Sequence, residues 1–135
     1  MDTKERVFDN KLKGFCCSES IMNMALEDMG WDQEKRQPLE KAMGAFCGGL
    51  HEELTCGTLC AAKAVLFLVE KDYVSAKEGT GAELMIWFKE RFGSWICADL
   101  LDGDLGRKLT LCPTIVEDTY IKLRDMLEDM GVIEL

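Results

Sequence analysis

The last third of the chain repeats apolar residues at alternating spacings of three and four, which is the period of one helix face. The repeat consists of Val116, Tyr120, Leu123, Leu127 and Met130. Pro113 stands just before it and Gly131 just after it, as is typical of the two ends of a helix. No segment shows a sustained alternation of apolar and polar residues, the pattern of a half-buried strand. The sequence therefore predicts an all-α bundle rather than a sheet.

The same reasoning places the other helices and gives a bundle of about five. The predicted helices cover residues 17–29, 38–46, 56–71, 82–92 and 113–130. Pro38 is expected in the first turn of its helix, and Gly79 and Gly81 are read as a linker. Residues 94–101 are expected to form a short extra turn before a turn-rich link at Asp102. The final helix also offers an amphipathic seam through which a homodimer could form.

A chain of 135 residues suits one domain, and 47% hydrophobic residues argue against sustained disorder. Residues 1–13 alternate in charge without an apolar core, so they are the candidate for a flexible N-terminal arm and do not resemble a secretory signal. The longest apolar run, residues 64–69, is too short to span a membrane. The sequence thus predicts a soluble, cytoplasmic protein.

The net charge of the chain narrows the classes of partner. Sixteen basic and twenty-five acidic side chains give a formal charge of −9. Such a chain repels both the phosphate backbone of nucleic acid and an anionic membrane surface. We therefore expect neither nucleic-acid binding nor membrane insertion.

The seven cysteines are the candidates for chemistry, and their number excludes complete internal pairing. In a cytoplasmic chain they indicate metal ligands, redox thiols or small buried apolar residues. No CxxC pair is present, so a site requires cysteines from distant segments to meet. Three of them are predicted at helix starts, where unpaired N–H groups favour the thiolate: Cys17, Cys56 and Cys112. The others leave packing and chemistry both open: Cys16, Cys47, Cys60 and Cys97.

Four segments together carry a resemblance to a known family. They are GFCCSES, AFCGGLHEELTCGTLCAA, FGSWICADLLDGD and CPTIVED. The chain resembles, from residue 14 to residue 127, the prokaryotic redox-active family named for its C_GCAxxG_C_C pattern. The family cysteines correspond to Cys17, Cys56, Cys97 and Cys112, while Cys16 replaces a residue that is usually polar. Within the CGAxxG motif, Thr58 replaces alanine and Ala61 replaces the last glycine, which brings close helix packing there into question.

The resemblance implies a cysteine-centred redox role and leaves three functions open. Four thiolates could hold an iron–sulfur cluster, or zinc, for electron transfer with a redox partner protein. A pair of the same cysteines could instead work as a thiol–disulfide oxidoreductase. The third function is a non-catalytic interaction module with structural zinc or core cysteines. We favour the cluster because thiol–disulfide exchange needs only two sulfurs, whereas four cysteines of the pattern are present. We expect that such a cofactor can be lost during aerobic preparation.

The remaining candidates have ordinary structural explanations. His51 is expected to be a solvated loop residue, and no neighbouring side chain that would orient it is identifiable. The methionines and tryptophans fall at core spacings, and the acidic pairs are expected on solvated faces. No phosphate-binding glycine loop is present. The sequence does not establish an enzyme with a substrate of its own.

Overall fold

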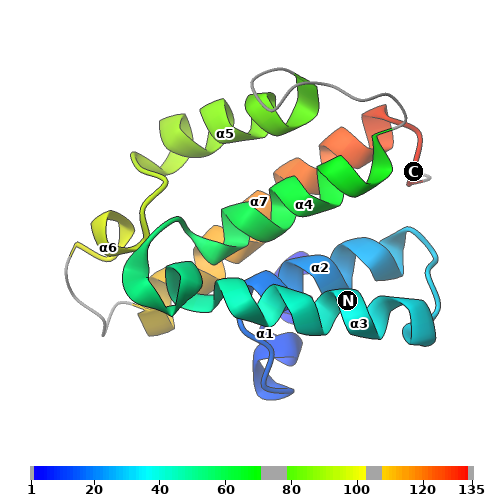
Figure 1. Ribbon diagram of the computed structural model, residues 1–135, viewed down its shortest axis with the longest axis horizontal. Coiled ribbons are helices and arrows are strands. Elements are labelled where there is room, and N and C mark those ends of the chain that lie inside the picture. The colour runs from blue at the N-terminus through cyan, green and yellow to red at the C-terminus, as the bar shows by residue number, and fades with distance from the viewer. Residues whose placement is uncertain (1, 71–78, 103–107, 134–135) are drawn as a thin grey trace.

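The computed structural model describes residues 2–70, 79–102 and 108–133, and within them every named element is helical (Figure 1). The α-helices are α1 (Thr3–Leu12), α2 (Cys17–Asp28), α3 (Gln33–Met43), α4 (Gly57–Val69), α5 (Gly79–Phe92), α6 (Cys97–Leu100) and α7 (Lys108–Asp129). Two short turns, η1 (Gly44–Phe46) and η2 (Gly49–Glu53), lie between α3 and α4. The predicted all-α class is confirmed, although the described part of the chain has seven α-helices rather than five.

The core lies where α2, α4 and α7 meet, with α3, α5 and α1 packed around them (Figure 1). Its largest fully buried side chains include Ile21, Met24, Leu59, Leu66, Tyr120 and Leu123. These residues stand at the helical spacings of three and four that the sequence shows. The apolar face of α7, which the sequence suggested as a dimer seam, is thus packed against helices of the same chain. Within the described ranges, no helix is long and apolar enough to cross a bilayer.

The N-terminal segment is helical, contrary to the sequence prediction. We expected residues 1–13 to form a flexible arm, but Thr3–Leu12 form α1, which packs against α7 and α2. Asp2 caps the helix by accepting a hydrogen bond from the Glu5 backbone N–H at 2.8 Å. Val7 is buried, and the buried Asn10 donates to Ser20 Oγ at 3.0 Å. Polar bonds from Asn10 and Arg6 anchor the helix beside Val7, and polar contacts of this kind leave no apolar period in the sequence.

Both prolines lie inside helices rather than in their first turns. α3 begins at Gln33 rather than at Pro38, and Asp32 caps it, since its carboxylate accepts from the Lys35 backbone N–H at 3.0 Å. In the same way α7 begins at Lys108, so Pro113 stands within it. Proline keeps a helical φ and removes one backbone bond, a loss that a helix with other anchors tolerates. As a consequence Cys112 lies inside α7 and not at its start, contrary to the prediction.

The glycines read as a linker begin α5 instead. The helix starts at Gly79, and Gly81 packs closely on α4, because an added Cβ would lie 3.3 Å from Lys63 Cε. The predictions for the third helix and for the short turn are confirmed by α4 and α6. The link at Asp102 is described only at its first residue; the rest of it lies outside the described residues.

Candidate functional site

The start of α2, the segment between α3 and α4, the start of α6 and the N-terminal part of α7 meet at one end of the bundle, at the left in Figure 1. They line a cavity of about 370 Å³ that opens to the surface. Six of the seven cysteines line it: Cys16, Cys17, Cys47, Cys56, Cys97 and Cys112. The four cysteines singled out by the family pattern are therefore on one cavity, although up to 95 residues separate them in the sequence.

Backbone bonds explain how two of these cysteines reach the cavity. Cys56 is the N-cap residue of α4, and Cys97 is the first residue of α6. The Cys56 N–H donates to Trp95 O at 2.8 Å, and the Cys97 N–H donates to Leu54 O at 2.6 Å. This small antiparallel bridge joins the two segments directly before their helices begin. The bridge therefore sets the starts of α4 and α6, and with them both cysteines, side by side.

A glycine allows α4 to approach α2 and η1 at the same place. A Cβ on Gly57 would lie 2.3 Å from Phe46 O and 3.4 Å from Cys17 Sγ. No larger residue fits without displacing the backbone around Phe46. Gly57 therefore stands at a point where a side chain has no room. The two departures from the CGAxxG motif, Thr58 and Ala61, are both buried. α2 and α4 pack against each other there, so these two residues do not prevent close helix packing.

The sulfur atoms are more widely spaced than a single closed ion site requires. In the described ranges, the one group of three ligand atoms lying mutually within 4.8 Å is formed by Cys16, Glu19 and Cys47. No three of the four family-pattern sulfurs are therefore that close together. A tetrahedral zinc site with Zn–S bonds of about 2.3 Å places its sulfurs about 3.8 Å apart. The four-cysteine arrangement is thus open relative to such a site.

Burial keeps at least one of these cysteines protonated. Burial, followed by the nearby Cys17 sulfur, raises the pKa of Cys56 to about 12. The backbone N–H groups of Thr58 and Leu59 act in the opposite direction but are outweighed. The expectation that the helix start favours a thiolate at Cys56 is therefore wrong. Cys60 lies on the same helix outside the cavity, and burial and Cys17 raise its pKa as well.

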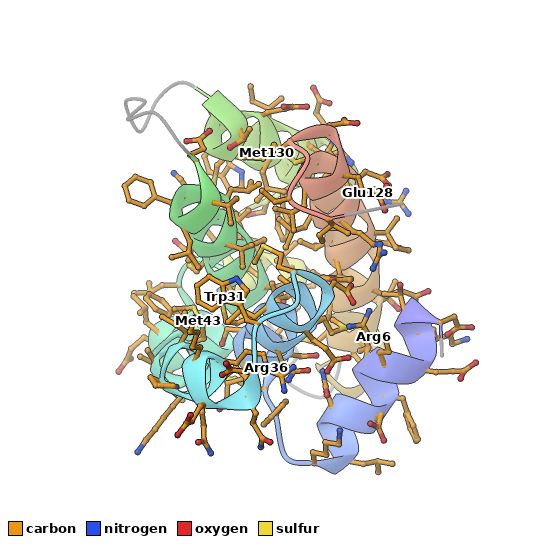
Figure 2. All side chains as sticks on the ribbon, turned by 90° about the vertical axis from the view of Figure 1, so that its right-hand side faces the viewer. Arg6, Trp31, Arg36, Met43, Glu128 and Met130 are labelled. Atoms are coloured by element: carbon orange, nitrogen blue, oxygen red, sulfur yellow. A yellow bond between two sulfur atoms is a disulfide. The ribbon has the colours of Figure 1, made fainter. Side chains whose placement is uncertain are left out.

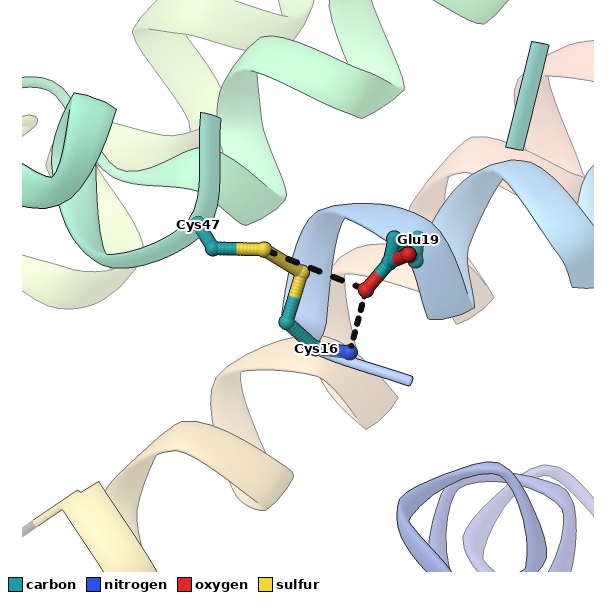
Figure 3. A group of neighbouring side chains, drawn as sticks. All are labelled: Cys16, Glu19 and Cys47. Atoms are coloured by element: carbon teal, nitrogen blue, oxygen red, sulfur yellow. Dashed lines mark hydrogen bonds between the residues drawn. A yellow bond between two sulfur atoms is a disulfide. The ribbon is translucent and has the colours of Figure 1, made fainter. Parts of the chain in front are cut away.

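The remaining two cysteines of the cavity form a disulfide, which the sequence did not predict. Cys16 at the N-cap of α2 bonds to Cys47, which follows η1, across a Cα–Cα distance of 6.0 Å. Figure 3 shows Glu19 beside the pair: its Oε1 accepts from the Cys16 N–H at 3.0 Å and lies 4.0 Å from Cys47 Sγ. The two cysteines are 31 positions apart, so no local motif connects them. In the sequence, only the odd number of cysteines indicated that they would not all have the same role.

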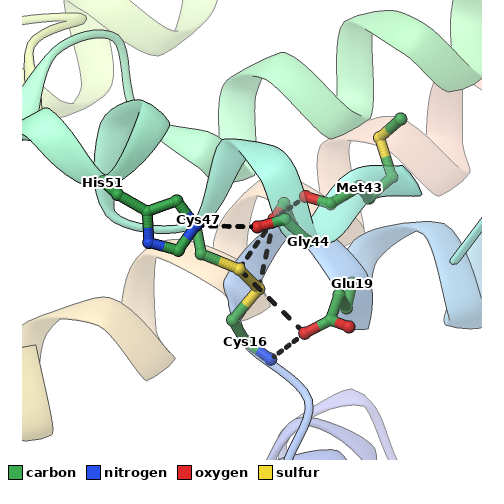
Figure 4. The surroundings of a disulfide bond; sticks show 7 residues. Cys16, Glu19, Met43, Gly44, Cys47 and His51 are labelled. Atoms are coloured by element: carbon green, nitrogen blue, oxygen red, sulfur yellow. Dashed lines mark hydrogen bonds between the residues drawn. A yellow bond between two sulfur atoms is a disulfide. The ribbon is translucent and has the colours of Figure 1, made fainter. Parts of the chain in front are cut away.

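His51 is held beside the disulfide by an unusual loop. Gly48, Gly49, Leu50 and His51 all have positive φ angles, which is uncommon for the last two residues. Figure 4 shows the imidazole next to Cys47, with its Nε2 3.0 Å from Gly44 O. The side chain is exposed, as predicted for a loop histidine, but it also lines the cavity. Backbone strain at such a position is typical of functional loops.

Comparison with known proteins gives one match. The model of a family described as "Putative redox-active protein (C_GCAxxG_C_C)" matches residues 15–126. No curated protein matches the chain. No solved structure matches it either.

Proposed function

The chain belongs to the C_GCAxxG_C_C family of redox-active proteins, and from this premise we propose that Cys17, Cys56, Cys97 and Cys112 hold an iron–sulfur cluster for electron transfer. One observation carries the proposal: cysteines from four separate elements line a single cavity. Thiolate sulfur is the ligand that iron–sulfur clusters take in proteins. A role in packing alone would not require the four to face the same hollow.

The spacing of the sulfurs favours a cluster over a single metal ion. A cluster carries its ligands on different iron atoms, so it needs sulfurs farther apart than a zinc ion does. The four cysteines are compatible with that requirement, since no three of their sulfurs lie mutually within 4.8 Å. Zinc therefore remains the second candidate, one that would require the segments to close further.

The four cysteines differ in how far they are exposed to solvent, so one side of the proposed cofactor would be more shielded than the other. Cys56 and Cys97 are 7% and 6% exposed, so their side of the cavity is shielded from water. Cys17 and Cys112 are half-buried and stand nearer the surface. Ligation requires the Cys56 thiol to lose its proton, and so binding should release protons and weaken as the pH falls. We propose the surface beside Cys17 and Cys112 as the place where a redox partner protein approaches.

Anaerobic purification followed by iron and sulfide analysis and a visible absorption spectrum tests the proposal. We expect bound iron and sulfide, with absorption in the visible range. Single Cys→Ser changes at the four positions should abolish both, whereas Cys60→Ser, a matched change outside the cavity, should leave them intact. A folded, colourless and metal-free protein would contradict the proposal. Bound zinc without iron would indicate the structural-zinc module instead.

A further inference from the structure

We propose that the Cys16–Cys47 disulfide is a second redox centre, which exchanges electrons with an external dithiol–disulfide couple. Neither cysteine belongs to the four that we assign to the cluster, so this inference goes beyond the proposed function and stands without it. The chemical class of its substrate is a dithiol, either a small molecule or a pair of protein thiols. Three features of the surroundings support a reversible bond rather than a permanent crosslink.

The first feature is access. Cys16 and Cys47 are both half-buried, and both line the 370 Å³ cavity. Cys16 also lines a second cavity of about 140 Å³, next to Lys11 and Phe15. Both partners of the disulfide therefore border one cavity, and Cys16 borders two. Accessible disulfides are the ones that take part in exchange, whereas structural ones resist reduction.

The second feature is that the joined segments are also held together without the bond. Ser18 Oγ donates to Met43 O at 2.7 Å, which ties the start of α2 to the end of α3. η1, which leads directly to Cys47, packs against both α2 and α4. Breaking the disulfide would leave these contacts in place. The two thiols would stay near each other, and such proximity is what re-oxidation needs.

The third feature is a polar setting for the released sulfurs. Ser18 Oγ lies 3.3 Å from Cys16 Sγ and 3.5 Å from Cys47 Sγ, and Ser18 is fully buried. Figure 4 shows Glu19 and His51 on either side of the same bond. Because the hydroxyl proton of Ser18 is donated to Met43 O, the hydroxyl oxygen can accept a hydrogen bond from the S–H of either thiol once the disulfide opens. The reduced state is therefore accommodated in the same surroundings as the oxidised state.

The exchange can be written so that atoms and electrons balance. A thiolate of the dithiol attacks one sulfur of the pair, the Cys16–Cys47 bond breaks, and a mixed disulfide forms. The second thiol of the donor then attacks its own sulfur in the mixed disulfide and releases the protein sulfur. Two electrons pass to the protein, and the two protons of the dithiol end on the sulfurs of Cys16 and Cys47. The donor leaves as a disulfide, and the reverse sequence restores the protein.

Redox titration of the full chain tests this inference. The protein is equilibrated in buffers of reduced and oxidised dithiothreitol, trapped with an alkylating agent and mapped by peptide mass spectrometry. We expect Cys16 and Cys47 to become labelled together at one midpoint, with the helical circular dichroism unchanged. In Cys16→Ser the labelling of Cys47 should no longer depend on the redox buffer. In Cys47→Ser the labelling of Cys16 should likewise no longer depend on it. Cys60→Ser, the matched control, should keep the wild-type midpoint.

Three results would overturn the inference. Labelling of the pair only after unfolding in urea would make the bond a permanent crosslink. Labelling in the most oxidising buffer would mean that no bond forms between these residues. Loss of helical signal together with reduction would mean that the fold depends on the bond. Iron and sulfide are measured on the same samples, so failure of the cluster proposal is recorded separately from failure of the disulfide proposal.

Discussion

The two ends of α2 bring distant segments together by different chemistry. At its N-terminal end, Cys16 and Cys17 stand on a cavity lined by sulfur atoms from four other places in the chain. At its C-terminal end, Asp28 accepts from Arg6 Nη1 at 3.0 Å and from Arg124 Nη1 at 2.5 Å, and also from the Tyr120 hydroxyl. Figure 2 shows Arg6 on α1, from which it reaches toward this end of α2. Both ends unite α2 with α7, but only one of them gathers sulfur.

The polar side chains at the Asp28 end bond to one another. A surface hollow of about 500 Å³ borders the Asp28 end, but the side chains that line it already bond to each other. Burial disfavours the charged Asp28, yet hydrogen bonds from Arg6 and Tyr120 outweigh it and lower the pKa of the carboxyl. Burial and then the Asp28 carboxylate raise the pKa of Tyr120. This network bonds its own members to one another and stabilises the fold, whereas the N-terminal end of α2 presents cysteines from several elements to one cavity.

Removal of the disulfide should have the largest effect on stability. A crosslink spanning 31 residues is expected to contribute about 3.5 kcal/mol through the entropy of the unfolded chain. We expect Cys16→Ser with Cys47→Ser to lower the free energy of unfolding by that amount in urea denaturation. Bound iron should be unchanged. Wild-type protein in dithiothreitol should match the double variant, and equal stability of the oxidised wild type and the variant would contradict the prediction.

Asp28→Ala should come next. Asp28 and Arg6 are only 15% and 17% exposed, so the change leaves two arginines without their shared partner. We expect a loss of about 3 kcal/mol in the free energy of unfolding, the lower end of the range for breaking a buried pair. Bound iron per folded protein should not change. Asp118→Asn, in the exposed pair with Arg91, is the control and should cost less than about 1 kcal/mol.

Gly57→Ala should have a smaller effect on stability but a direct effect on the cavity. The new methyl group would meet Phe46 O at 2.3 Å, so α4 or η1 must shift at a cost of about 2 kcal/mol. Since Cys17 Sγ lies beside the same position, we expect the bound iron to fall as well. Gly44→Ala, where the nearest atom is 3.5 Å away, is the matched control. Wild-type iron content in Gly57→Ala would show that the cavity does not depend on this contact.

The smallest expected effect is on the pH dependence of stability. The pKa of Asp28 is lower in the folded state than its ordinary value of 3.8, so its contribution is complete above that value. The contribution is lost as the pH falls through the pKa of the folded state, because below it the carboxyl is protonated in both the folded and the unfolded state. Asp28→Asn should therefore flatten the acid side of a plot of unfolding free energy against pH. A parallel acid side in the variant would show that Asp28 does not govern it.

Much of the fold followed from apolar spacing, and the misses share a physical cause. The helix predicted for residues 56–71 matches α4, and Gly30 follows the end of α2 as expected. α1 was missed because it is anchored by Val7 and the Asn10 hydrogen bonds, which leave no period in the sequence. The starts of α3 and α7 were misplaced because a proline was taken as a first-turn residue. Local preference describes an isolated segment, and neighbouring helices can override it.

Some features of the candidate site were also predictable from the sequence, and others were not. The order and spacing of motifs identified Cys17, Cys56, Cys97 and Cys112, and the structure places all four on one cavity; their role as ligands stays a prediction. The partnership of Cys16 with Cys47 was not predictable, since nothing local links residues 31 positions apart. The raised pKa of Cys56 was also missed, because a helix start favours the thiolate only while water remains near it.

The sequence alone determined that the chain is helical and which four cysteines share the family pattern, because both are properties of spacing along the chain. Only the tertiary structure decided which sulfurs meet, which pair bonds and which thiol is kept neutral. These depend on distances through space and on the exclusion of water, and both arise when α2, α4 and α7 pack together. Asp28 makes the same point, since its partners on α1 and α7 become neighbours only in the folded chain.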